Sequence, residues 1–199
     1  MLKPLFCFIT MHFLVCCATS WELKTVKTQI KALNLKSNLK ISYLCTGIGN
    51  YETIYSLTKF LTEHAESDFF LVNIGICWHT CPQTPPKAIQ IWRIKNLTTQ
   101  KELLPPLPVL FEQIASIRSS ETVMTKQIIE ENSFVDMESR GIELVCDKFR
   151  ISRIFLKVPF DKIWIETQNF DKEKALEMLA NHIDYERLIK SLTSQELIH

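Results

Sequence analysis

The chain has 199 residues, 46% of them apolar, which is enough to bury the core of one domain. Its 23 basic and 22 acidic residues leave a formal net charge of +1, and no basic block stands out. This balance argues against nucleic acid or an anionic membrane as the main partner. We therefore expect one domain over residues 1–199, of which residues 1–10 can form an N-terminal extension.

The N-terminal segment supports two interpretations. Residues 1–20 combine a lysine, an apolar stretch and small residues near Ala18, as a secretory signal does. The alternative is a buried strand over residues 12–18 (HFLVCCA), because an amphipathic helix follows at once over residues 22–34. This continuity favours the strand, and an exported, disulfide-containing envelope protein remains the alternative.

Cysteine usage bears on the same choice. The seven cysteines are odd in number, scattered and mostly set in apolar runs, which is typical of buried free thiols in a reducing compartment and indicates the cytoplasm. Only CWHTC, residues 77–81, resembles a metal cluster, and no second ligand pair follows at zinc-site spacing. We interpret it as a loop at the edge of a pocket and expect no metal.

The rest of the chain alternates short apolar strands with amphipathic helices, which predicts an α/β sandwich with a largely parallel sheet. A last long helix follows Asp171, which can cap it. Prolines indicate a loop over residues 77–87, and a short helix or irregular structure over residues 104–118. Strands are predicted at residues 39–45, 69–75, 88–94 and 151–160, and further helices at residues 52–64 and 138–149.

Three of the predicted strand ends carry carboxylates, at Glu22, at the pair Asp136 and Glu138, and at Asp161. Ligands of such sheets bind beyond the carboxyl ends of the strands. Acids gathered in one pocket raise one another's pKa and can divide into proton donor, base and hydrogen-bond acceptor. Taken singly, each is better explained by structure, since the helix dipole alone favours an acid such as Glu138 at a helix start.

Five motifs follow one another along the chain: ATSWE (18–22), TGIG (46–49), VNIG (72–75), VDMES (135–139) and a strand that ends in Asp161. Their combined order resembles the purine nucleoside phosphorylase and nucleosidase superfamily. VDMES is the most specific of them. The resemblance implies a three-layer α/β/α sandwich with a mixed, largely parallel central sheet, and a homodimer with pockets near its interface.

The resemblance also implies roles for individual residues. Glu22 activates water, Asp161 protonates the leaving base, and Glu138 binds the ribose hydroxyls, while Asp136 braces the loop. Lys157 occupies the position where methylthioadenosine nucleosidases often have arginine. The further binding residues implied are Met137 and Ile48 near the sugar, Val123 and Met124 in the base pocket, and Ile76, Cys77, Trp78 and Phe160 along the pocket-edge segments. The three acids and a water suffice for this reaction, so no cofactor is expected.

The same residues separate the activities within the superfamily. The turn ATSWE has neither the arginine nor the glycine with which phosphorylases bind phosphate, so we expect water to be the nucleophile. Cys77, Trp78 and Phe160 depart from the pattern of methylthioadenosine/S-adenosylhomocysteine nucleosidases. They make the chain more similar to futalosine hydrolase, which releases the base from futalosine or 6-amino-6-deoxyfutalosine on the route to menaquinone. A methylthioadenosine/S-adenosylhomocysteine nucleosidase and a non-catalytic nucleoside-binding protein of the same fold are the alternatives.

Overall fold

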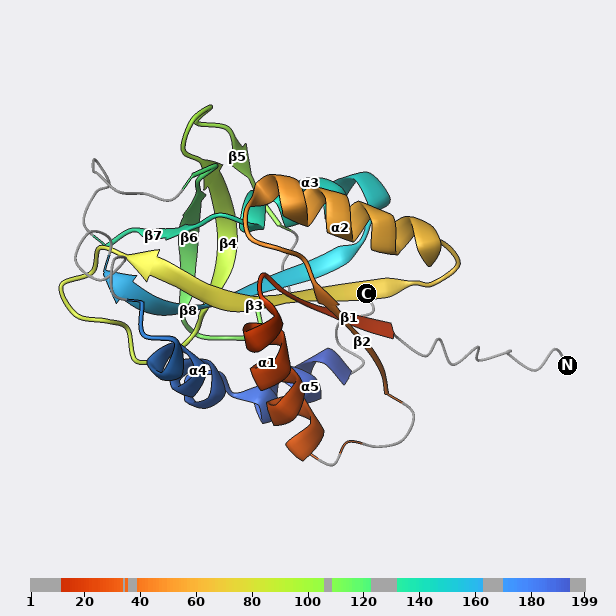
Figure 1. Cartoon of the computed structure of the whole chain (residues 1–199), viewed down its shortest axis with the longest axis horizontal. Coiled ribbons are helices and arrows are strands. Elements are labelled where there is room, and N and C mark those ends of the chain that lie inside the picture. Colours follow the sequence, from red (N-terminus) through yellow and green to blue (C-terminus); the bar gives the residue numbers. More distant parts are fainter. Residues whose placement is uncertain are drawn as a thin grey trace, which may run out of the picture.

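The computed structural model describes residues 12–33, 35, 39–105, 109–122, 132–162 and 170–193, with the side chains of Asp161 and Lys162 outside the description. Within these ranges, eight strands form one mixed sheet and five helices lie on its two sides (Figure 1). None of these helices combines the length and the hydropathy that a membrane crossing requires.

Three parallel strands form the open part of the sheet. β1 (His12–Cys17) lies between β2 (Lys40–Cys45) and β3 (Phe69–His79) and is parallel to both. All of β1 is buried, because a central strand with helices on both faces has no side exposed to solvent, and its continuous apolar sequence suits that position. The strand predicted at residues 12–18 is therefore confirmed.

The remaining strands extend β3 into a closed ring. β8 (Ser152–Lys162) is parallel to β3 and antiparallel to β4 (Ile89–Asn96), which is parallel to β6 (Ile114–Ser119). β7 (Phe134–Asp136) is parallel to β6 and pairs with the end of β3, which closes the ring. A short strand, β5 (Glu102–Leu103), pairs with β4.

This ring refines the predicted fold class. The α/β fold with a mixed, largely parallel sheet is confirmed. However, five of the strands close on themselves in a barrel-like arrangement, whereas a three-layer α/β/α sandwich has an open middle layer. Register shifts at Cys77–His79 of β3 and at Ile91–Arg93 of β4 accompany the closure, as expected of bulges, which bend and twist strands.

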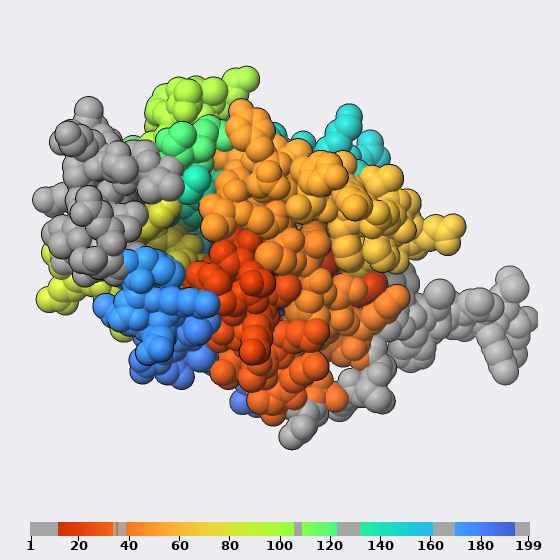
Figure 2. Space-filling model, viewed as in Figure 1, coloured from red at the N-terminus to blue at the C-terminus, as the bar shows by residue number. Residues whose placement is uncertain are grey.

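Two groups of helices cover the sheet (Figure 1). α2 (Asn50–Glu63) and α3 (Ser139–Phe149) pack against each other on one side, while α1 (Ser20–Ala32), α4 (Lys172–Asn181) and α5 (Tyr185–Thr193) lie on the other. Each group buries its own apolar cluster against the sheet. The space-filling view shows α4 directly beside α1 (Figure 2).

Two local predictions are wrong and a third holds only in part. Cys77, Trp78 and His79 belong to the end of β3 rather than to a loop, because this end pairs with both β7 and β8. The segment over residues 104–118 is irregular in its described residues before Ile114, as one of the two predicted alternatives has it, but Ile114 to Arg118 belong to strand β6.

The last long helix is two helices. Asp171 caps α4 as predicted, by accepting a hydrogen bond from the amide of Lys174 at 3.0 Å. The Asp184 side chain accepts the amide of Arg187 at 2.8 Å and so provides a second cap, at which α5 begins. The sequence analysis missed this second capping residue.

Candidate active site

Glu22 lies in the first turn of α1, directly after β1, and is 2% exposed. Its Oε2 accepts hydrogen bonds from the amide and the hydroxyl of Thr19 at 2.9 and 2.8 Å, and its Oε1 accepts one from the amide of Ile76 at 3.2 Å. The Thr19 hydroxyl accepts the Glu22 amide in return, so the two residues form a capping box. This local cap fixes the carboxylate at the end of β1.

The surroundings of Glu22 favour a carboxyl group that retains its proton to higher pH than usual. Burial raises the pKa of Glu22, while the hydrogen bonds from Thr19 and Ile76 and the charge of Lys157 offset part of the rise.

Gly75 of β3 leaves room beside this carboxylate for a buried cation. It is in register with Lys157 of β8, which is 2% exposed. A Cβ at position 75 would lie 3.2 Å from Glu22 Oε1 and 3.7 Å from Lys157 Nζ. The Glu22 carboxylate and the Lys157 ammonium therefore both lie beside Gly75, which has no side chain to separate them.

Asp136, at the end of β7, contacts both the Lys157 ammonium and Ser139 at the start of α3. Its Oδ2 accepts the amide of Ser139 at 3.0 Å and the Ser139 hydroxyl, and it lies 2.8 Å from Lys157 Nζ. Its Oδ1 is buried and has no hydrogen-bond partner among the residues that the structure describes. The charge of Asp136 is thus compensated through one oxygen.

Glu138 occupies the N-cap position of α3, where its side chain makes no capping hydrogen bond, and is 8% exposed. Its Oε1 accepts a hydrogen bond from the amide of Gly49 at 2.9 Å. Gly49 lies in the TGIGN turn and has a φ of +93°, which glycine adopts readily. Burial and the negative charge of Asp136 raise the pKa of Glu138 to about 7, even though Lys157 and the Gly49 amide act in the opposite direction. Glu138 therefore retains its proton to higher pH than an ordinary glutamate does.

Lys157 is the cation that these acids share. Burial alone would lower the pKa of Lys157, but the carboxylates of Asp136 and Glu138 raise it to about 12, so the ammonium keeps its charge. Its charge also acts on the pKa of Glu22. The structure therefore brings the predicted residues Glu22, Asp136 and Glu138 together. Apart from its resemblance to a family position, the sequence signal for Lys157 was a lysine inside the apolar strand IFLKVPF.

The other predicted site residues differ in burial, and some lie outside the described residues. Met137 is buried, and its Cε would lie 4.0 Å from a Cβ at Gly49, whereas Ile48 in the same turn is 60% exposed. Phe160 is 2% exposed and belongs to the apolar cluster beneath α1, α4 and α5. On β3, Ile76 and Trp78 are half-buried and Cys77 is buried. Val123 and Met124 lie outside the described residues, as does the side chain of Asp161, whose backbone belongs to β8.

The sequence analysis missed the contact that holds the TGIGN turn against α3. The side chain of Asn50 accepts the amide of Gly141 at 2.7 Å and donates to the carbonyl of Ser120 at 3.1 Å. A Cβ at Gly141 would lie only 2.7 Å from the backbone oxygen of Asn50. The glycine inside the helix SRGIELVC was the available signal, since such a glycine often marks close packing.

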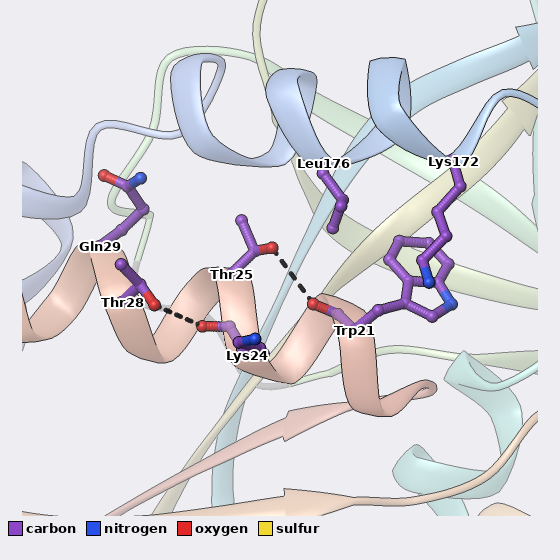
Figure 3. Close-up of a pocket in the computed structure, with 7 residues that line it drawn as sticks. All are labelled: Trp21, Lys24, Thr25, Thr28, Gln29, Lys172 and Leu176. Carbon is purple, nitrogen blue, oxygen red and sulfur yellow. Dashed lines mark hydrogen bonds between the residues drawn. The ribbon is translucent and has the colours of Figure 1, made fainter.

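A surface groove of about 340 Å³ lies between α1 and α4. Figure 3 shows its lining, which consists of Trp21, Lys24, Thr25, Thr28 and Gln29 from α1 and Lys172 and Leu176 from α4. None of these seven residues is acidic, so we do not assign the site to this groove. Within the described ranges, no three His, Cys, Asp or Glu side chains gather as a metal site requires.

Comparison with solved structures identifies the fold. The sequence matches no protein-family model, and no curated protein sequence is similar to it. A 5'-methylthioadenosine/S-adenosylhomocysteine nucleosidase from Helicobacter pylori, with butyl-thio-DADMe-Immucillin-A, has a TM-score of 0.74 at 10% identity, over 93% of this chain and 98% of that chain.

Two further structures agree with this match. Futalosine hydrolase of Helicobacter pylori strain 26695 has a TM-score of 0.74 at 11% identity, over 92% of this chain and 98% of that chain. A variant MTAN from Chlamydia trachomatis, bound to MTA, has a TM-score of 0.66 at 22% identity, over 92% of this chain and 100% of that chain. The chain therefore has the same fold as these two nucleosidases and this futalosine hydrolase.

Proposed function

We propose that the protein is a purine nucleosidase, which hydrolyses the N-glycosidic bond of a purine nucleoside. The observation that carries this proposal is the burial of Glu22, Asp136 and Glu138 around the Lys157 ammonium. Three buried acids beside one cation are costly to a fold. The pKa values of Glu22 and Glu138 are raised, and acids with such shifts are concentrated at functional sites. Solved nucleosidases with the same fold support the choice of reaction.

In the proposed reaction Glu138 binds the sugar. An ionised carboxylate can accept two hydrogen bonds from a vicinal diol. Its negative charge also stabilises the sugar more strongly as C1' becomes cation-like in the transition state, and this difference accelerates the reaction.

Glu22 is the proposed general base and Asp161 the proposed general acid. Oε1 of Glu22 accepts one hydrogen bond, from Ile76, and so retains a lone pair for the proton of a water molecule. A pKa raised by burial suits a base that works near neutral pH. Water attacks the face of the sugar opposite the base, as in an inverting glycosidase, while Asp161 protonates the departing purine.

For the substrate we propose futalosine or aminodeoxyfutalosine, on the route to menaquinone, with methylthioadenosine and S-adenosylhomocysteine as the alternative. The half-buried ring of Trp78 on β3 supports this order, since it could stack on the benzoate-bearing end of futalosine. Phe160 lends no further support, because it packs against Phe170, with 5.5 Å between the ring centroids, in the apolar cluster.

Base release from a panel of nucleosides tests the proposal. Purified protein is incubated without phosphate with aminodeoxyfutalosine, futalosine or methylthioadenosine, and free adenine or hypoxanthine is measured by chromatography. We expect release from at least one of them, and no release from any would contradict the proposal. Glu22→Gln and Asp161→Asn should each lower kcat by about a hundredfold or more, as the loss of a general acid or base does, while retaining binding.

Calorimetry on the same panel separates the enzyme from a non-catalytic binding protein. Tight nucleoside binding by the wild-type protein without turnover would favour the binding protein. Turnover of one substrate over the others, compared as kcat/KM, decides between the futalosine and methylthioadenosine alternatives.

A homodimer in the cytoplasm completes the proposal. Ile48, Tyr51 and Tyr55 are 60%, 77% and 67% exposed. Tyr51 and Tyr55 are one turn apart on α2 and Ile48 lies in the turn before it, and these exposed apolar side chains support pairing with a second copy. Six cysteines in the described part of the chain are free, and four of them are buried, which agrees with a reducing compartment. Light scattering of the purified protein measures the oligomeric state, and a monomer at micromolar concentration would contradict the pairing.

A further inference from the structure

Lys157 has none of the roles proposed above, yet its ammonium lies among the three buried carboxylates. We propose that Lys157 is a positioning residue: through its ion pair with Asp136, it keeps the neighbouring Glu138 carboxylate in the ionised form that binds a sugar diol. The diol-binding part rests on the proposed function, whereas the charge state of Glu138 can be measured without any substrate.

The geometry of the ion pair leaves Asp136 dependent on Lys157. The two side chains are 2% and 1% exposed and lie 2.8 Å apart, so water does not screen their interaction. Oδ2 of Asp136 forms the ion pair with Lys157 and accepts hydrogen bonds from the amide and the hydroxyl of Ser139. Oδ1 of Asp136 has no hydrogen-bond partner in the described part of the chain. Without Lys157, the negative charge of Asp136 would act on Glu138 uncompensated.

Three charged groups from the surrounding elements act on the ionisation of Glu138, beside the amides of Gly49 and Met137 that donate to its carboxylate at 2.9 and 3.4 Å. Asp136 of β7 and Glu22 of α1 disfavour its ionised form, whereas Lys157 of β8 and the amide of Gly49 before α2 favour it. Among the described residues that face Glu138, Lys157 is the one cation. Since burial also acts against the charged form, loss of Lys157 would leave Glu138 protonated at neutral pH. A protonated carboxyl group donates one hydrogen bond itself and so loses acceptor capacity towards the diol.

The charge state of Glu138 is measured by 13C NMR on protein labelled at the glutamate carboxyl carbons, with the Glu138 signal assigned through Glu138→Gln. We expect a midpoint near 7 in the wild-type protein. Lys157→Met removes the charge and should raise the midpoint by about one unit or more, as removal of a nearby opposite charge does. Lys157→Arg retains the charge and should restore a midpoint close to that of the wild-type protein.

A second pair of variants covers the case in which Lys157→Met does not fold, because it leaves Asp136 buried and unpaired. Asp136→Asn and the double variant Asp136→Asn/Lys157→Met both lack this unpaired charge. The Glu138 midpoint should be higher in the double variant than in Asp136→Asn. Equal midpoints in the two proteins would overturn the inference.

Kinetics of base release provide the functional test. If the Glu138 midpoint is 7 in the wild type and 8 in Lys157→Met, about half of Glu138 is ionised at pH 7 in the wild type and about a tenth in the variant. The KM of Lys157→Met should then be about fivefold higher than the wild-type KM at pH 7 and should converge with it at pH 9. Equal kinetic loss at every pH, with an unchanged Glu138 midpoint, would mean a structural role and would overturn the inference. The two parts of the inference can fail separately. If the wild-type protein releases no base, the proposed function and the diol-binding role are contradicted. A shifted Glu138 midpoint in the Lys157 variants would then still support the electrostatic role of Lys157.

Discussion

Gly141→Ala adds one methyl group where α3 meets the start of α2. The new Cβ would lie 2.7 Å from the carbonyl oxygen of Asn50 and 3.1 Å from its Cα, whereas ordinary contacts begin at 3.4 Å. Both neighbours are backbone atoms, which cannot rotate away. The two helices must therefore separate locally by about 0.7 Å, the difference between 3.4 and 2.7 Å.

Three contributions set the expected change in the free energy of unfolding. Overpacking of this kind costs about 1–3 kcal/mol. Separation of the helices also weakens the 2.7 Å hydrogen bond from the Gly141 amide to Asn50 Oδ1, and such a bond contributes about 1 kcal/mol. Alanine in a helix is better than glycine by about 1 kcal/mol, which offsets part of the loss. The net loss is about 2 kcal/mol, or about 4–8 °C in Tm for a domain of this size.

Urea denaturation and thermal melting measure this loss, with Lys148→Ala at an exposed position of the same helix as the control. Base release should also change, because Gly49 of the displaced turn donates to Glu138 at 2.9 Å. We expect a higher KM in Gly141→Ala and an unchanged one in Lys148→Ala. A Gly141→Ala protein as stable as the wild type would refute the backbone contact between α2 and α3.

Three further predictions concern the buried charges and the groove. Because the pKa of Glu138 is raised, its stabilising contribution is present below pH 4.5 and is lost as the pH rises through 7. Glu138→Gln should therefore be more stable than the wild type by about 3 kcal/mol at pH 8 and about equally stable at pH 4.5. Urea denaturation at both pH values measures the difference, and an equal difference at the two would contradict this. Arg153 donates from Nε to Glu143 at 2.9 Å in a buried pair, so Arg153→Met should cost about 3–5 kcal/mol and Arg153→Met/Glu143→Leu much less, by the same assay. Leu176→Lys places a charged side chain in the groove between α1 and α4. It should leave kcat/KM unchanged, because the groove contains none of the proposed site residues; a large loss of kcat/KM would indicate that the substrate binds in the groove.

Local patterns predict the parts of this fold that depend on neighbouring residues. The continuous apolar run of β1, the amphipathic α1 and the cap at Asp171 are each determined within a few residues of sequence, and all three are found. The gathering of Glu22 and Glu138 was predicted from the rule that parallel strand ends share one edge of a sheet. The rule does not explain the result, because β1 is parallel to β3 whereas β7 is antiparallel to it.

Contacts between distant segments escape such patterns. The barrel-like closure depends on antiparallel pairing of Ile89 and Gln90 with Lys157 and Leu156, more than sixty residues apart in sequence. The role of Lys157 depends on its register with Gly75, which no spacing in the sequence reveals. The extension of β3 through CWH likewise depends on two partner strands, whereas composition alone suggested a loop.

The capping box of α1 has a consequence for evolution as well as for chemistry. The Glu22 carboxylate that is proposed to receive a proton from water also terminates the helix, through the amide and hydroxyl of Thr19. Both oxygens of this carboxylate are held by hydrogen bonds from Thr19 and Ile76, so little reorganisation is needed when water and nucleoside bind. A lineage that abandoned hydrolysis would still be selected to retain this glutamate, and its presence in a descendant would then be a sign of helix stability rather than of turnover.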